Sequence, residues 1–191
     1  MPRPRFNKLS PQKQARILEA AAREFAAHGY EAASLNQILA EAGISKGAAY
    51  YYFDGKADLY ATAVTTYAGD MMTGLPETMA TVTADSFWPT LHALYSRQFT
   101  AAYEQPWVFG LVKSASRLTP EQLEETGLIG TFGQMHLFLV GLIGKGQQVG
   151  AVRRDLPQTL LINLLMAIDD ALDHWLLDHW STLTATEMQQ I

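Results

Sequence analysis

Apolar residues recur at helical spacing along nearly the whole chain, and this periodicity constrains the fold more than any other feature. Ile17, Leu18, Ala21, Ala22 and Phe25 are typical, because residues three and four positions apart share one face of a helix. The sequence contains no convincing run of alternating β-branched residues flanked by hairpin turns. It therefore predicts an all-α fold.

Capping residues predict where the first helices begin and end. Ser10 followed by Pro11 is typical of a helix start, and His28-Gly29 of a helix end, so the first helix is expected over about 11–28. Ser34-Leu35-Asn36-Gln37 has the pattern of a capping box and opens a short second helix, which ends at Ala42-Gly43.

Two further helix starts follow closely. Ser45 is expected to cap a third helix over 46–52, and Asp54 a fourth from about 55 to 72. Because only Gly43-Ile44-Ser45 separates the second helix from the third, the sequence predicts a helix-turn-helix. Longer helices are expected over 86–103, 106–117, 121–148 with a break near Gly127 to Gly130, and 158–180.

Composition narrows the class of protein. With 191 residues, 48% of them hydrophobic and 17% charged, the chain can bury a core and is not disordered. It has no cysteine, which excludes a thiolate nucleophile and cysteine-ligated metal sites. Polar residues follow the basic N-terminus where a signal peptide would have its apolar region. We expect a cytoplasmic protein without a cofactor.

The longest charge-free stretch, residues 126–144, is long enough to cross a bilayer. It contains Gln134, His136, two threonines and five glycines, which favour a buried helix over a membrane span. We therefore expect no membrane partner.

Charge is distributed unevenly along the chain. Residues 1–60 contain eight Lys and Arg against six acids, a net charge of +2, whereas the remainder contains six against thirteen, a net charge of −7. This division suggests a small anion-binding module joined to an acidic body. Two faces of one ordinary acidic protein would give the same sums.

Residues 17–64 carry an ordered set of motifs: Ile17-Leu18-Glu19-Ala20-Ala21, Phe25, His28-Gly29-Tyr30, Ala42-Gly43-Ile44-Ser45-Lys46-Gly47, Tyr50-Tyr51-Tyr52-Phe53, Gly55-Lys56 and Leu59. This segment resembles the DNA-binding domain of the tetracycline-repressor (TetR) family of bacterial transcriptional regulators. The resemblance implies a helix-turn-helix DNA-binding domain over 1–55 and a larger helical regulatory domain over 56–191. It also implies a homodimer that binds a palindromic double-stranded DNA operator, most often as a repressor, and that has no enzymatic activity.

A recognition helix enters the major groove only if its first residues are small and its flanks bind phosphate. The predicted DNA-binding residues are Ser34, Asn36, Gln37, Ser45, Lys46, Gly47, Ala48, Tyr50, Tyr51, Tyr52 and Lys56. The tyrosines have an alternative role in core packing, Tyr51 foremost, and the two serines could simply cap helices. Arg3 and Arg5 could reach into a minor groove or form a solvated tail.

The family resemblance also implies an apolar pocket for a small-molecule inducer in the acidic body. The candidate lining residues are Trp88, His92, Tyr95, Phe99, Trp107, Phe109, Gln134 and His136. For each aromatic residue taken singly ordinary core packing is the favoured explanation, since a helical bundle of this size needs such residues, whereas the set as a whole is compatible with a pocket.

The helix over 158–180 is apolar nearly all round in its first half, so a partner subunit is expected to cover one side of it. Following the family, we assign the dimer interface to Leu161, Leu165, Ile168, Leu172 and Trp175. The second interface helix could be 131–148, where Gly133, Gly141 and Gly144 would permit close approach.

Asp170, His174 and Asp178 share one stripe of that helix at four-residue spacing. Such a stripe could bind a metal ion, and a helical metal-binding protein or enzyme is therefore the alternative interpretation of the chain. A solvated face is the simpler explanation, because one helix offers few converging ligands, and we predict no metal site. A DNA binder that needs no inducer is a further alternative.

Overall fold

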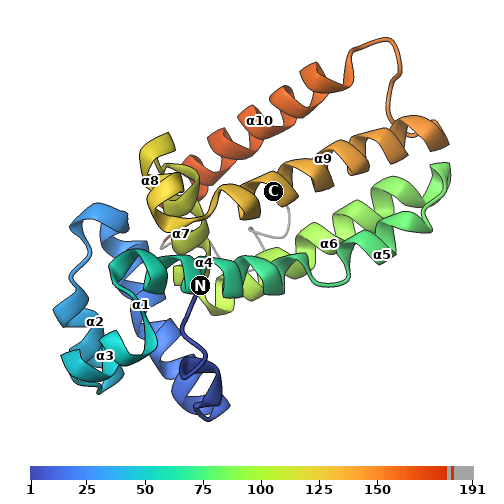
Figure 1. The fold of residues 1–191 in the computed structure, drawn as a ribbon. Helices are drawn as coiled ribbons and strands as arrows, with labels where there is room; N and C mark the ends of the chain where they lie inside the picture. Colours follow the sequence, from blue (N-terminus) through green and yellow to red (C-terminus); the bar gives the residue numbers. More distant parts are fainter. Residues whose placement is uncertain (180–181, 183–191) are drawn as a thin grey trace. The chain divides into compact units, whose positions relative to one another are not determined.

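The computed structural model describes residues 1–179 and 182, without the side chains of residues 70–72, 76, 97–104, 173 and 177. Within these residues every regular element is a helix, so the predicted all-α fold is confirmed. The elements drawn in Figure 1 are η1 (Phe6–Lys8), α1 (Pro11–Ala32), α2 (Leu35–Ala42), α3 (Lys46–Tyr52), α4 (Lys56–Met72), α5 (Leu75–Ala80), α6 (Ala84–Glu104), α7 (Pro106–Ser116), α8 (Pro120–Thr126), α9 (Ile129–Val149) and α10 (Gln158–His179).

The predicted caps account for the starts of α1, α2 and α3 and for the end of α2. The Ser10, Ser34 and Ser45 hydroxyls accept hydrogen bonds from the backbone N–H three residues later, at 3.4, 3.3 and 3.2 Å. Gly43 ends α2 with φ +64°, a left-handed conformation that costs a side-chain-bearing residue energy. The chain therefore turns sharply enough for α3 to begin three residues later.

Two predicted caps differ from the structure. The Ser34 N–H donates to Glu24 of α1 at 2.8 Å rather than to Gln37, so only half of the expected capping box forms. The Asp54 carboxylate accepts from Arg3 instead of capping α4, and Asp58 in the first turn of α4 accepts the Asp54 N–H at 3.0 Å. In the first case Glu24 takes the Ser34 N–H, and in the second Arg3 takes the Asp54 carboxylate. Both partners are distant in sequence from the expected cap.

The chain divides into two compact units, residues 1–71 with 105–131 and residues 72–104 with 132–191. The boundary predicted at residue 55 does not coincide with this division, because α4, α7 and α8 belong to the same unit as α1. As a division between DNA-binding and regulatory functions, the boundary at residue 55 stays a prediction.

In the first unit α1 packs closely on α7. A Cβ atom at Gly110 would lie 3.0 Å from the Cβ of Ala26, so the glycine permits the close approach of the two helices. Phe25 and Tyr60 are fully buried beside this contact, with ring centroids 4.7 Å apart. Within this unit α2 packs on α1, and α3 packs on α2.

The second unit has its own core, in which Met79, Val82, Phe87 and Leu142 pack together. A Cβ atom at Gly146 of α9 would lie only 2.8 Å from the Phe87 ring. The start of α10 is attached to α9 because the Gln158 amide donates to the Val140 carbonyl at 2.8 Å. Among the described residues no single helix is long and apolar enough to cross a membrane. Taken together, α8 and α9 have the length and composition of a membrane span, but the chain bends by 110° between them.

Candidate nucleic-acid interface

The helices α2 and α3 lie next to each other and form the predicted helix-turn-helix (Figure 1). Ile38, Leu39, Ala42 and Ala49 are buried and attach the pair to the first unit. The other faces are exposed: Asn36, Gln37, Ser45, Lys46 and Gly47 all lie at the surface. The structure thus brings together the predicted DNA-binding residues of the two helices on one small motif.

The beginning of α3 is narrow. A Cβ atom at Gly47 would meet nothing closer than the Ser45 hydroxyl at 3.9 Å, and Ala48 adds only a methyl group. Lys46 places one positive charge at this end of the helix. Small leading residues let a helix approach the floor of a major groove, and a lysine beside them suits a phosphate.

The three tyrosines of α3 have different surroundings. Tyr50 and Tyr51 are 45% and 48% exposed, so the core-packing alternative for Tyr51 is wrong. Tyr52 is half-buried, and its ring packs edge-on to Phe6 at 6.4 Å between centroids. Successive side chains of a helix point about 100° apart, so Tyr52 faces the protein while Tyr50 and Tyr51 face outward.

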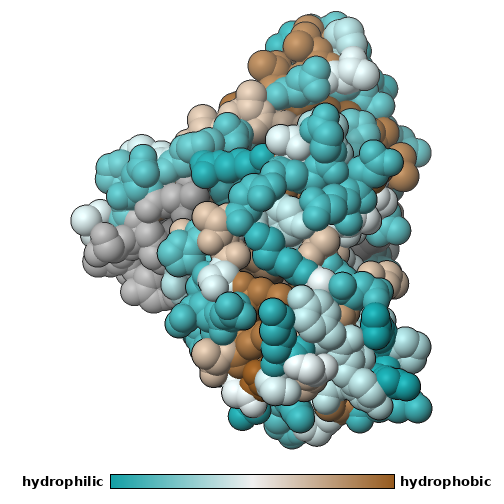
Figure 2. Space-filling model, turned by 60° about the vertical axis from the view of Figure 1, so that its left-hand side comes forward, coloured by the Kyte–Doolittle hydropathy of each residue, from teal (hydrophilic) through white to brown (hydrophobic). Residues whose placement is uncertain are grey.

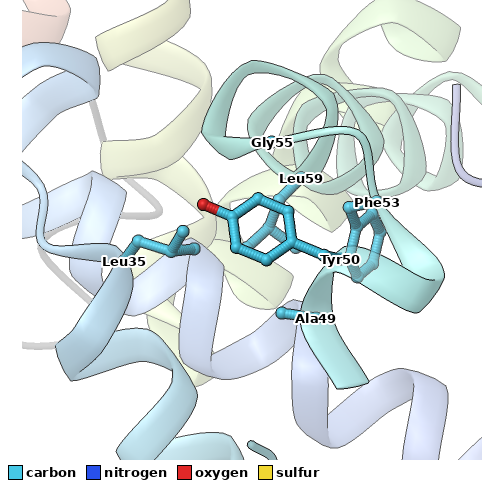
Figure 3. A pocket seen from close by; sticks show the side chains of 6 residues that line it. All are labelled: Leu35, Ala49, Tyr50, Phe53, Gly55 and Leu59. Atoms are coloured by element: carbon cyan, nitrogen blue, oxygen red, sulfur yellow. The ribbon is translucent and has the colours of Figure 1, made fainter. Parts of the chain in front are cut away.

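Tyr50 lies across a shallow apolar hollow lined by Leu35, Ala49, Tyr50, Phe53, Gly55 and Leu59. Figure 3 shows its ring between Leu35 and Phe53, with the hydroxyl pointing away from Phe53. The ring is therefore bordered by apolar side chains, while Tyr50 as a whole stays 45% exposed. A ring held in this way suits a directional contact with a partner.

The N-terminal arm, residues 3–9, is folded against α3, so the solvated-tail alternative is wrong. Phe6 is only 2% exposed and lies 4.8 Å from the Phe53 ring. The Arg3 N–H donates to the Tyr52 carbonyl at 2.9 Å, and its guanidinium donates to Asp54. Sequence reasoning missed this packing, although a lone aromatic residue in a basic arm was the available signal.

Lys56, a predicted phosphate contact, is also used inside the protein. Its ammonium donates to the Glu31 carbonyl at 2.8 Å and lies 5.1 Å from the Tyr30 ring centroid. These contacts tie the start of α4 to the end of α1. The prediction that Lys56 contacts DNA is untested, and any such contact would compete with these bonds.

The predicted inducer-site residues fall in different compact units. Trp107 and Phe109 belong to the first unit, where Trp107 packs edge-on to Tyr67 at 4.9 Å. The others belong to the second unit, where the Trp88 indole donates to the Ala151 carbonyl at 3.1 Å and the Tyr95 hydroxyl to Asp169 at 3.5 Å. His92, Gln134 and His136 are exposed, and the Phe99 side chain lies outside those described.

The predicted dimer residues line one side of α10. Leu161, Leu165 and Leu172 are half-buried, whereas Ile168 and Trp175 are exposed, and Leu160 and Leu164 extend the exposed apolar stripe toward the start of the helix. In Figure 2 brown apolar patches interrupt a surface that is otherwise mostly hydrophilic. A row of exposed large apolar side chains is unusual on a monomer and typical of an interface.

The acidic stripe of α10 forms a local pair. The His174 imidazole lies 2.7 Å from the Asp170 carbonyl and 3.5 Å from its carboxylate. Within the described part of the chain there is no group of three or more His, Asp or Glu residues that could hold a metal ion.

Two short helices joined by a glycine turn, the second of them exposed and beginning with small residues, place this all-α chain in the class of helix-turn-helix proteins. Residues 17–63 match the family described as bacterial regulatory proteins, tetR family. The match covers these N-terminal residues, and the rest of the chain lies outside it.

Two curated relatives match the same region. The transcriptional activator FasR of Mycolicibacterium smegmatis is 29% identical over 72 residues, which are 38% of this chain and 33% of FasR. The transcriptional repressor SCO4008 of Streptomyces coelicolor is 38% identical over 63 residues, 33% of each chain. The chain thus matches about a third of the length of these relatives.

The similarity of fold extends further than the similarity of sequence. The crystal structure of the regulator FadR from Bacillus subtilis, in complex with stearoyl-CoA, has a TM-score of 0.74 and covers 92% of both chains at 19% identity. This comparison concerns the fold alone.

Proposed function

We propose that the chain is a DNA-binding transcriptional regulator of the TetR type, and that it acts in the cytoplasm as a repressor. The observation that carries the proposal is the exposed face of α3, where Lys46, Gly47 and Tyr50 combine a charge, a narrow start and a supported aromatic ring. Phosphate contacts fix the register of such a helix, and base-edge contacts read sequence. The similarity to named regulators supports this assignment.

The regulator works as a homodimer through α10. Its exposed stripe of Leu160, Leu164 and Ile168 would be covered by the same stripe of a second copy, as twofold symmetry requires. Two recognition helices related in this way read a palindromic operator whose half-sites lie roughly 34–36 Å apart, or a multiple of that.

A small, mainly hydrophobic ligand releases the repressor from its operator. The similar fold of FadR, solved with stearoyl-CoA, makes a long-chain acyl-CoA the first compound to test. The ligand must bind the released state more tightly than the DNA-bound state, and a hundredfold fall in operator affinity requires about 2.7 kcal/mol of that difference.

Selection of bound sequences from random double-stranded DNA, with and without stearoyl-CoA, tests the proposal. We expect a palindromic sequence to be enriched, and its binding to weaken when the acyl-CoA is added. Lys46→Ala should weaken binding to every duplex and reduce its salt dependence, whereas Tyr50→Ala should also reduce sequence preference. A wild-type protein that binds no duplex even at low salt would contradict the proposed function; indifference to stearoyl-CoA would contradict only the choice of ligand.

A further inference from the structure

We propose that Arg5 contacts a DNA phosphate from a position fixed by the ring of Tyr51, and that Arg3 is a positioning residue that holds the arm on α3. The inference rests on the proposed function, because it adds a contact outside the helix-turn-helix to the same interface. It gives different roles to two arginines that are only two residues apart.

Arg3 is occupied by the protein itself. Its guanidinium donates twice to one Asp54 carboxylate oxygen, at 2.9 and 2.5 Å, and its N–H donates to the Tyr52 carbonyl. The pair with Asp54 cancels the charge of the side chain. Arg3 therefore fastens the arm to the end of α3 and the turn before α4, and contributes little positive potential of its own.

Arg5 has a different environment. Its guanidinium carbon lies 4.1 Å from the centroid of the Tyr51 ring, and none of the ion pairs among the described residues involves it. A guanidinium stacked by its face keeps the N–H groups of its edge free to donate, and that planar edge matches the oxygens of a phosphate. The stacking partner is an exposed residue of the recognition helix.

The arm presents this charge in a fixed place. Phe6 is buried directly after Arg5, η1 forms one short turn, and the Gln14 amide donates to the Leu9 carbonyl at 2.9 Å. The chain up to Glu19 has five Lys and Arg residues and no Asp or Glu, so nothing in this stretch repels a polyanion. Because the arm is already folded, Arg5 loses little conformational freedom when it meets a phosphate.

The salt dependence of DNA binding tests the proposal. Wild type and Arg5→Gln are titrated with the selected operator and with a random-sequence duplex at several salt concentrations. We expect Arg5→Gln to lose about tenfold in affinity near 0.1 M salt on both duplexes, and the slope of log affinity against log salt to become shallower by about 0.9 for each Arg5 that contacts a phosphate. Equal slopes for the two proteins would overturn the proposal.

Two further variants serve as controls. Arg3→Gln combined with Asp54→Asn removes the ion pair at unchanged net charge and loosens the arm, so we expect weaker binding and a slope no shallower than that of Arg5→Gln; a slope shallower than that of Arg5→Gln would mean that Arg3 itself contacts a phosphate and would overturn its positioning role. Tyr51→Phe keeps the ring and should preserve the wild-type slope, whereas Tyr51→Ala should reduce it as Arg5→Gln does. If wild type binds DNA and Arg5→Gln matches it, only this inference fails; if wild type binds no duplex, the proposed function fails as well.

Discussion

Tyr60 is a polar residue at the centre of the first unit. It is fully buried, its ring packs against Phe25 and Tyr30, and its hydroxyl lies 2.9 Å from that of Ser114. Burial raises the pKa of Tyr60 from 10.0 to about 12, although the bond with Ser114 acts in the opposite direction. Burial also raises the pKa of Tyr30, and its hydrogen bond to Glu125 adds to that rise.

These tyrosines predict a loss of stability at high pH. A raised pKa means that the folded state favours the neutral phenol, so the stabilisation is complete below pH 10 and is lost as the pH rises from 10 toward 12. Urea unfolding at stepped pH measures this fall. Tyr60→Phe should show a smaller fall than wild type, and identical falls would contradict the assignment; Ser114 keeps a partner in this variant because it donates to the Leu111 carbonyl.

At the scale of elements, α8 is joined to α1 by side chains far apart in sequence. The Tyr30 hydroxyl donates to Glu125 at 2.8 Å, and the Gln122 amide donates to Glu31 at 2.7 Å. Gln122 also completes the capping box with Thr119 that starts α8. The glycine break in α1 at Gly29 turns the chain just before Tyr30, so both contacts arise where the regular helix ends.

A double-mutant cycle measures the strength of this junction. Tyr30→Phe and Glu125→Gln should each lower the free energy of unfolding, and their coupling should be about 1 kcal/mol, less than a fully buried charged hydrogen bond because Glu125 is exposed. Glu124→Gln, a neighbouring exposed carboxylate, is the control and should change stability by less than about 0.5 kcal/mol. Additive effects of the two variants would argue against the bond.

Helices with strong local signals could be predicted from sequence, and those without could not. α3 begins and ends where Ser45 and the residues after Tyr52 indicate, because caps and glycines act over a few residues. α5 and η1 were missed, since six and three residues are too few to show a helical period. The folded arm depends on Phe6 meeting Phe53, a contact between segments that no local pattern encodes.

The same limit applies to the candidate site. The exposed residues of α2 and α3 follow from a motif at short spacing, so they could be predicted. The inward bonds of Lys56 could not, because they depend on where α1 ends relative to α4. The ligand residues rest on the family resemblance and on composition, and neither specifies which aromatic side chains share a compact unit.

For the whole molecule, the proposed dimer predicts that one substitution on α10 abolishes operator binding. Ile168 is 65% exposed, so Ile168→Lys should leave the protomer folded but oppose pairing of two apolar stripes. We expect sedimentation to show a monomer and operator affinity to fall roughly 10²-fold or more, because two half-sites can no longer be bound together.

Asn163→Lys provides the matched control. Asn163 is also exposed on α10 but lies on another side of the helix, so the added charge should leave dimer and affinity unchanged. Leu137→Lys on α9 tests the second interface helix, since Leu137 is 68% exposed. A wild-type protein that stays monomeric would contradict α10 as an interface.

The packing of the arm on α3 has a practical consequence for anyone who purifies or labels this protein. Arg3 and Phe6 contact the residues that follow the recognition helix. An affinity tag or fluorescent fusion joined ahead of them would therefore disturb the packing of the arm against α3. Such a fusion would weaken operator binding and imitate an inducer in a reporter assay. Labels are better attached to an exposed loop.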